Sequence, residues 1–191
     1  MLAQLTTVKA RLGITDTTDD TLLTNMIAHA SGRFDVQCRR LFTRTVNKED
    51  EFVGDDTELR LICYPIETVA SFHLKYDETE GWVLESDVDY LIRRGSVISL
   101  HGKLASEAEQ LKVTYTGGYV LPGTAPVGSE VALPSEIEQG CVEQVSYWYQ
   151  NRNRLGLVTV SGEGGNVQQF AQLDLLPHVK AVLMQHERWN N

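Results

Sequence analysis

The segment from Lys112 to Arg154 constrains the fold of this chain more than any other. An alternating strand pattern stops at the glycine pair Gly117-Gly118, where backbone conformations that other residues avoid become available. A loop rich in Pro and Gly follows over about a dozen residues, and Pro134 then marks the start of a helix. The segment contains no nucleophile, metal-binding cluster or phosphate loop. A region with clear structural signals but no catalytic or binding motif indicates a part of an assembly and not an enzyme.

Length and composition indicate an ordinary globular protein. The chain has 191 residues, of which 42% are hydrophobic and 23% are charged, which suits one domain or one domain with a sizeable insertion. The net charge of −9 argues against broad binding to nucleic acid or to an anionic membrane. No apolar run approaches the length of a membrane span, and the N-terminus lacks the pattern of a signal peptide. We therefore expect a protein made in the cytoplasm, without membrane contact.

Apolar residues at helical spacing predict helices at both ends of the chain. Thr6 or Thr7 is expected to cap a short first helix that stops at Gly13. Spacings of three and four then predict a helix of about five turns. Its apolar stripe comprises Leu22, Leu23, Met26, Ile27, Ala30, Phe34, Cys38 and Leu41.

The last third of the chain predicts two further helices. Ser135 and Glu138 have the spacing of a capping box for the first of them. One face of that helix carries Ile137, Cys141, Val145, Trp148, Tyr149 and Arg152. Pro177 is expected to open the closing helix, with Val179 and Leu183 turned inward.

The middle third predicts strands. Apolar and polar residues alternate in six short segments, which are 58–64, 68–76, 81–84, 90–93, 97–100 and 111–115. Turn residues separate them, so we expect an antiparallel meander of five or six strands. The predicted fold class is α+β, with a helical bundle from the N- and C-terminal segments and an inserted antiparallel β-sheet. The expected domains are a helical core of residues 1–44 and 116–191 and an inserted β subdomain of residues 45–115.

A search for catalytic or metal-binding residues yields none that we would assign. None of the five histidines has a second histidine four residues away or a cysteine at zinc spacing. The cysteines Cys38, Cys63 and Cys141 lie on apolar faces and are expected to be reduced core residues. Only Cys38 has basic neighbours in sequence that would lower a thiol pKa. We predict no catalytic residue, no metal and no cofactor, although paired carboxylates of a hydrolase would not be visible in sequence.

Three segments carry a resemblance to a known family. The first is Leu5-Thr-Thr-Val-Lys-Ala-Arg-Leu-Gly-Ile with the acidic turn and helix that follow, and the second is Val113-Thr-Tyr-Thr-Gly-Gly-Tyr. The third is Leu133-Pro-Ser-Glu-Ile-Glu-Gln-Gly-Cys, continued to Tyr149-Gln-Asn-Arg and to a closing Glu187-Arg188-Trp189. In this order they resemble the head–tail connector proteins of tailed bacteriophages, also called adaptor or head-completion proteins. Smaller members of that family have little β structure between the helical ends, so the resemblance makes residues 45–115 an insert in a connector core.

The resemblance implies a structural virion protein of the neck, without catalytic residues. Such proteins form a ring, typically of twelve copies, under the portal vertex, where the ring extends the DNA channel. The implied partners are the portal protein, a stopper or tail-completion protein, further copies of the chain, and genomic DNA that passes without sequence-specific contact. An acidic lumen would keep the duplex from sticking as it passes. Two alternatives stay open: a stopper or tail-completion protein of the same neck, or a small ligand-binding or hydrolase domain that uses the sheet.

Two segments are candidates for contacts with partners. The C-terminal segment ends in an arginine and a tryptophan, which are residue types enriched at interface hot spots. The candidate portal interface comprises Val179, Leu183, Arg188 and Trp189. The glycine-dotted segment 155–172 has little apolar surface of its own and is expected to face the channel or the next subunit. Its central residues are Gly162, Glu163, Gly164 and Gly165.

Overall fold

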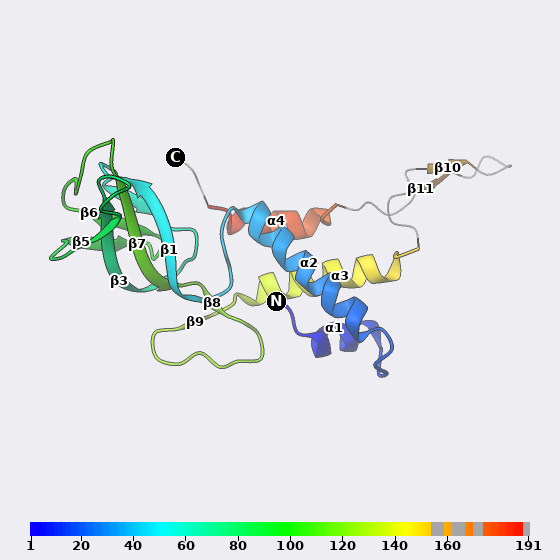
Figure 1. Cartoon of the computed structure of the whole chain (residues 1–191). Coiled ribbons are helices and arrows are strands. Elements are labelled where there is room, and N and C mark those ends of the chain that lie inside the picture. Colours follow the sequence, from blue (N-terminus) through cyan, green and yellow to red (C-terminus); the bar gives the residue numbers. More distant parts are fainter. Residues whose placement is uncertain (154–158, 162–166, 170–173, 189–191) are drawn as a thin grey trace. The chain divides into compact units, whose positions relative to one another are not determined.

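The chain forms two compact units, each with its own core (Figure 1). The computed structural model describes residues 1–153, 159–161, 167–169 and 174–188. The helical unit comprises Met1–Cys38 and Leu133–Asn191, and the β unit comprises Arg39–Ala132. The fold is α+β with an antiparallel main sheet, as the sequence predicts. The β unit is longer than the expected range 45–115, because the chain on both sides of the strands stays packed on the sheet.

The helical unit contains the helices that the apolar spacing predicts. They are α1 (Leu5–Leu12), α2 (Asp20–Cys38), α3 (Ser135–Gln150) and α4 (Pro177–Gln185). The end of α1 at Gly13 is confirmed, since this glycine has the left-handed φ of 70° that suits a C-cap. Both predicted N-caps are wrong. Helix α1 is capped by Gln4 and α3 by Pro134, so Thr6 and Ser135 already lie inside their helices and neither cap makes a side-chain hydrogen bond.

The core of the helical unit lies where the helices meet. Helix α2 buries Leu23, Ile27, Ala30, Phe34 and Cys38, and α3 buries Ile137, Cys141, Val142, Val145 and Trp148. Burying such side chains stabilises the fold by about 1.5–3 kcal/mol each for the larger ones. Two residues of the predicted stripe do not belong to it. Leu22 is exposed, and Leu41 lies beyond the helix, because Arg39 adopts a φ of 52° and ends it.

The strands of the β unit form two main sheets. The first contains β1 (Thr45–Val53), β7 (Gln110–Gly117), β3 (Ile66–Lys75) and β4 (Trp82–Glu85) in that order, and the second β2 (Glu58–Arg60), β6 (Val97–Leu100) and β5 (Tyr90–Arg93). All their pairs are antiparallel. The strand order is therefore not the expected meander. Strand β7 lies between β1 and β3, and its residues Leu111, Val113 and Tyr115 are fully buried.

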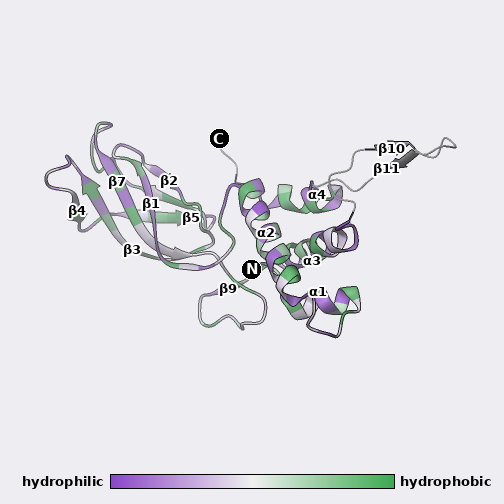
Figure 2. Cartoon of the chain, turned by 45° about the vertical axis from the view of Figure 1, so that its right-hand side comes forward, coloured by the Kyte–Doolittle hydropathy of each residue, from purple (hydrophilic) through white to green (hydrophobic). Residues whose placement is uncertain are grey.

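The core of the β unit is built from both sheets. Its buried members are Leu59, Leu61, Cys63, Phe72, Leu74, Ile98, Leu100, Leu111, Val113 and Tyr115. Hydrophobic residues recur along these strands in Figure 2, where they alternate with polar ones as half-buried strands require. The β unit thus has a hydrophobic core of its own.

The glycine pair after β7 allows three backbone segments to meet. A Cβ on Gly117 would lie 2.4 Å from the carbonyl oxygen of Cys63. A Cβ on Gly118 would lie 2.8 Å from the backbone of Arg44, and its φ is 100°. The N–H of the next residue, Tyr119, donates to the Phe42 carbonyl at 2.7 Å. The glycines are therefore needed for the close approach that the sequence pattern indicates.

A closed loop follows the glycine pair. Strands β8 (Tyr119–Val120) and β9 (Val131–Ala132) pair in parallel and bring the ends of residues 121–130 together. Arg44 lies 2.8 Å from Glu67 and 3.3 Å from Glu130, so one guanidinium joins the base of the loop to β3. Strands β10 (Thr159–Ser161) and β11 (Val167–Gln169) form a separate antiparallel ribbon in the C-terminal part of the chain.

We expect Gly118→Ala to destabilise the β unit. The new Cβ would force either a strained left-handed backbone or a shift of the Arg44 segment, at a cost of about 1–3 kcal/mol in the free energy of unfolding. Gly102→Ala is the matched control, because nothing lies within 4 Å of its Cβ position and its φ is not left-handed. The control should stay within about 0.5 kcal/mol of the original protein. Urea unfolding followed by tryptophan fluorescence measures both, and equal stabilities would contradict the role of Gly118.

Candidate assembly surfaces

Helix α4 is tied closely to the rest of the helical unit. Val179 and Leu183 are each 1% exposed, so these two candidate interface residues lie in the core. The Cys38 thiol donates to the Leu183 carbonyl at 3.4 Å. The N–H of Arg188 donates to the Cys38 carbonyl at 2.9 Å, which holds the chain after α4 against the end of α2. Val179 and Leu183 therefore position the C-terminal segment and do not present a surface themselves.

Two histidine–carboxylate pairs connect α4 to α3. His178 Nε2 lies 2.6 Å from Glu143 Oε2, and His186 Nε2 lies 3.1 Å from Glu136 Oε1. A hydrogen bond from Gln139, and then the pairing with His178, hold the pKa of Glu143 below its usual range. The sequence patterns did not indicate these pairs, since their partners lie 35 and 50 residues apart.

In the described part of the C-terminal segment, Met184 and Arg188 differ in exposure. Met184 on α4 is 63% exposed, and Arg188 is half-buried. Trp189 and the loop residues Gly162, Glu163, Gly164 and Gly165 lie outside the described residues. Of the three candidates that the structure describes, Val179, Leu183 and Arg188, it leaves Arg188 near the surface.

The three cysteines are core residues, as the sequence predicts. All three are free thiols and buried. Burial raises the pKa of Cys141 to about 12 and also raises the pKa of Cys63. A thiol with a raised pKa is a poor nucleophile at neutral pH. The thiol of Cys38, which the sequence singles out, points to the Leu183 carbonyl inside the core.

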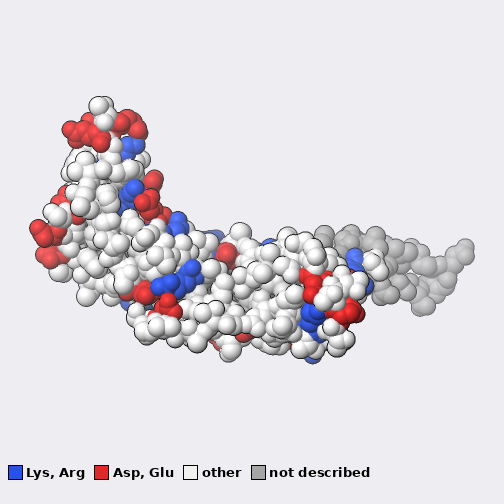
Figure 3. All heavy atoms as spheres, turned by 60° about the horizontal axis from the view of Figure 1, so that its bottom comes forward, with Lys and Arg blue, Asp and Glu red and all other residues white. Residues whose placement is uncertain are grey.

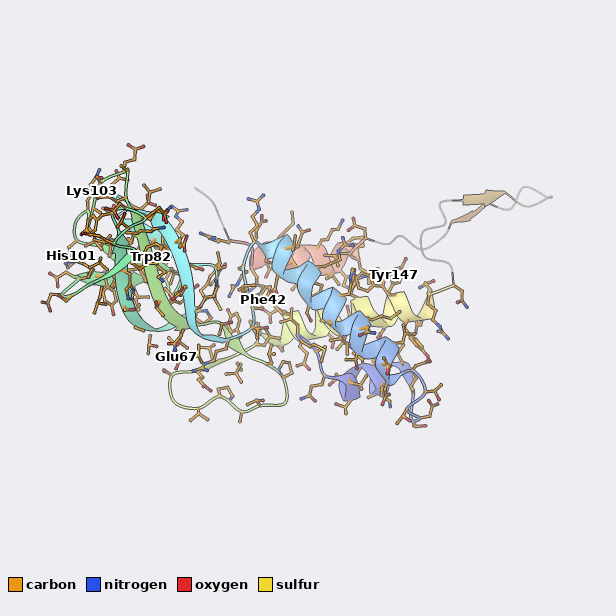
Figure 4. The ribbon with its side chains drawn as sticks, in the orientation of Figure 1. Phe42, Glu67, Trp82, His101, Lys103 and Tyr147 are labelled. Atoms are coloured by element: carbon orange, nitrogen blue, oxygen red, sulfur yellow. The ribbon has the colours of Figure 1, made fainter. Side chains whose placement is uncertain are left out.

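The buried charged groups inside the β unit contact aromatic side chains of the same unit. The Tyr115 hydroxyl donates to Asp50 Oδ2 at 2.7 Å and accepts the N–H of Cys63 at 3.0 Å. Burial, and then the bond to Asp50, raise the pKa of Tyr115. Arg40 is 4% exposed, and its guanidinium lies 3.4 Å from the centre of the Tyr64 ring. The ring of Phe42 (Figure 4) flanks the same guanidinium at 4.7 Å.

A surface of exposed apolar side chains lies on β4 and β5. Leu84 is 61% exposed, and Tyr90, Leu91 and Ile92 are 38%, 55% and 37% exposed. Figure 2 shows hydrophobic residues on both strands. Near them, a groove of about 380 Å³ is lined by residues 69–72 of β3, by residues 84–88 and by Tyr90. The groove that Leu84 and Tyr90 line is therefore a candidate site of interaction.

Neither a metal centre nor a membrane-spanning helix is found in the described part of the chain. Within the described residues, no group of three or more His, Cys, Asp or Glu side chains is placed to hold a metal ion. None of the described helices combines the length and the hydropathy that crossing a bilayer requires. The features that stand out are therefore the surfaces on β4 and β5 and at the end of α4.

Comparison with known proteins identifies the family. The family model for the head completion protein (HCP) matches residues 1–189. The chain belongs to the head completion protein family. This match confirms the resemblance carried by the segments around Leu5, Val113 and Leu133. A search of curated proteins finds no match.

Three solved structures with the same fold come from gene transfer agent (GTA) particles. A chain in the neck of an empty GTA particle computed with C6 symmetry matches with a TM-score of 0.61 and 14% identity, and one in the virion of the native GTA particle with 0.59 and 12%. A chain in the neck of the native GTA particle computed with C12 symmetry matches with 0.52 and 13%. Each alignment covers 100% of this chain and 91% of the other. The head completion protein fold described here is thus shared over the whole chain, including the β unit.

We expect Glu143→Gln to lower the stability of the helical unit at pH 7 and to have little effect in acid. The pKa of Glu143 is lower in the folded chain than its ordinary value of 4.5. The stabilisation is therefore present above pH 4.5 and is lost as the pH falls through the folded pKa. The effect should be about 0.2–1 kcal/mol, as for other exposed pairs. Urea unfolding between pH 7 and pH 3 measures it.

Glu107→Gln, in an exposed turn of the β unit, is the control for the loss of one negative charge. It should leave the pH dependence of unfolding as it is in the original protein. A Glu143→Gln protein that unfolds like the original at every pH would contradict the role of the α3–α4 pairs.

Proposed function

We propose that this chain is a structural protein of a tailed-phage neck that forms an adaptor ring between the portal and the stopper or tail. The observation that carries the proposal is the match of the head completion family model to residues 1–189. The necks in which the fold recurs were computed with C6 and C12 symmetry, which supports a cyclic arrangement of copies here. Twelve copies is the number we propose for the ring. The ring has no catalytic role and uses neither a metal nor a cofactor.

The charge of the chain suits a protein that surrounds passing DNA. The net charge is −9, and the β unit holds sixteen Asp or Glu against ten Lys or Arg. On the face shown in Figure 3, acidic side chains gather at the end of the β unit. We propose that the ring extends the DNA channel and that like charge keeps the duplex from binding as it passes.

We propose that the C-terminal segment binds the portal protein. Helix α4 is anchored by its buried face and by contacts to α2 and α3. Its outer side presents Met184, and the half-buried Arg188 and then Trp189 follow the helix in sequence. Arg and Trp are enriched among interface hot spots, so a small number of contacts there can supply much of the affinity.

Mixing the purified chain with the portal protein of its phage tests the ring. Negative-stain images should show portals that carry an additional ring, and bare portals at saturating protein concentrations would contradict the proposal. Deletion of residues 186–191 should reduce portal binding at least tenfold, because it removes the hot-spot residue types. His186→Ala in the full chain is the control. It removes the pair with Glu136 but keeps Arg188 and Trp189, and it should bind as the original does.

We also propose that the β unit is an insertion in the connector core. Support comes from its compactness and from its own buried cluster. A fragment of residues 39–132 should therefore fold alone and show one cooperative thermal transition in circular dichroism. A fragment without such a transition would mean that the β unit depends on the helical unit.

A further inference from the structure

The groove of the β unit lies beside an unpaired strand edge. Strand β3 pairs with β7 along one side, but on its other side β4 pairs only with Phe72 to Lys75. At the start of β3, the N–H of Ile66 donates to Gly95 at 2.7 Å. Among the described strands, none pairs with β3 on this side over residues 67–71. Unpaired edges of this kind add strands from other chains.

The groove is lined by both apolar and polar side chains and is partly open. Residues 69–71 of the unpaired edge line it together with Leu84 and Tyr90. The rings of Phe72 and Tyr90 lie 5.4 Å apart and join β3 to β5. Strand β5 is itself at the edge of its sheet. The groove therefore offers both backbone groups and apolar side chains to an extended segment, which is the combination used in β-augmentation.

The C-terminal part of the same chain contains two strands that could pair with such an edge. In the described part of the chain, β10 and β11 pair only with each other. A single two-stranded ribbon is at best marginally stable in water, because it has two unpaired edges and no sheet to cover it. Joining an existing sheet edge would remove one of these edges.

Charge and length are compatible with this pairing. The rim of the groove contains Glu85 and Asp87, so a segment with carboxylates would be repelled. Neither β10 nor β11 contains a charged residue, and the one carboxylate of the ribbon, Glu163, lies in the segment that connects the two strands. Each has three residues, which fits within the five unpaired residues 67–71 of β3. The loop 121–130 is also nearly uncharged, but it presents no unpaired strand.

We propose that the β10–β11 ribbon of one copy docks in the groove of a neighbouring copy and extends its β3 edge. The inference rests on the proposed ring, because a closed ring needs a contact between two different surfaces of neighbouring subunits. A groove on one side of the contact and a ribbon on the other provide such a heterologous pair. The segment that includes Gly162 to Gly165 connects the two strands of the ribbon in sequence.

The first test uses two leucines on exposed strands. Leu84 lines the groove, whereas Leu91 on β5 does not, and they are 61% and 55% exposed. Leu84→Asp should reduce the fraction of chain assembled into rings on the portal at least tenfold, because it removes an apolar wall of the groove and adds a third carboxylate beside Glu85 and Asp87. Leu91→Asp should assemble as the original does. Equal assembly of the two variants, whether both intact or both lost, would overturn the docking site.

The second test identifies the occupant by disulfide formation between two chains. One protein carries Leu84→Cys and the other, with an affinity tag, carries Gln168→Cys at the centre of β11. The native cysteines are buried and should not react. Mild oxidation of a mixture should link the tagged and untagged chains in rings on the portal and in concentrated free protein. A link of Leu84→Cys only to itself or to the portal, or no link in assembled rings, would refute the ribbon as occupant.

The two tests separate this inference from the proposed ring. Rings assembled from the two cysteine variants without a mixed disulfide would leave the adaptor function intact and reject the docking of the ribbon in the groove. A mixed disulfide in free protein that never forms rings would support the exchange and reject the adaptor ring. Absence of both rings and disulfides would reject both.

Discussion

The β unit depends on a buried carboxylate. Asp50 is the one buried residue of β1, and its side chain accepts hydrogen bonds from the Tyr115 hydroxyl of β7 and from the N–H of Ile62. Lys48 lies 3.3 Å from its second oxygen. A buried charge without such partners would cost several kcal/mol, and removing one donor costs about 1–3 kcal/mol. The carboxylate thus holds three segments together: β1, β7 and the chain around Ile62.

This dependence explains which strands the sequence could predict. Strands β3, β6 and β7 alternate apolar and polar residues, and the pattern located them closely. Strand β1 escaped the pattern because its buried residue is an aspartate and its sequence is rich in charge. The strand order could not be predicted from the alternating pattern either. Alternation shows which face of a strand is buried but not which strand lies beside it. The caps of α1 and α3 were wrong for a related reason, because the chain enters these two helices a residue or more before the suitable capping residues. The start of α4 at Pro177 was predicted correctly.

The candidate surfaces were harder to predict than the fold. Val179 and Leu183 have the spacing of a helix face, and sequence cannot tell whether that face meets the chain's own core or a partner. For the same reason, the groove could not be predicted from the sequence. Leu84 and Tyr90 belong to segments that alternate like core strands, yet both are exposed because β4 and β5 are edge strands. The glycine pair was the exception. Where backbones approach closely only glycine fits, so the sequence itself indicates the contact.

The loop 121–130 has a further consequence for how relatives of this chain can diverge. Its two ends are held side by side by the β8–β9 pair and by Arg44, independently of what lies between them. Residues 123 to 129 are exposed. Doubling the length of a loop costs only about 0.6 kcal/mol in closure entropy. Evolution can therefore lengthen or rewrite this loop with little penalty to the fold, and an epitope or fluorescent label inserted there would report on the neck without disturbing its subunits.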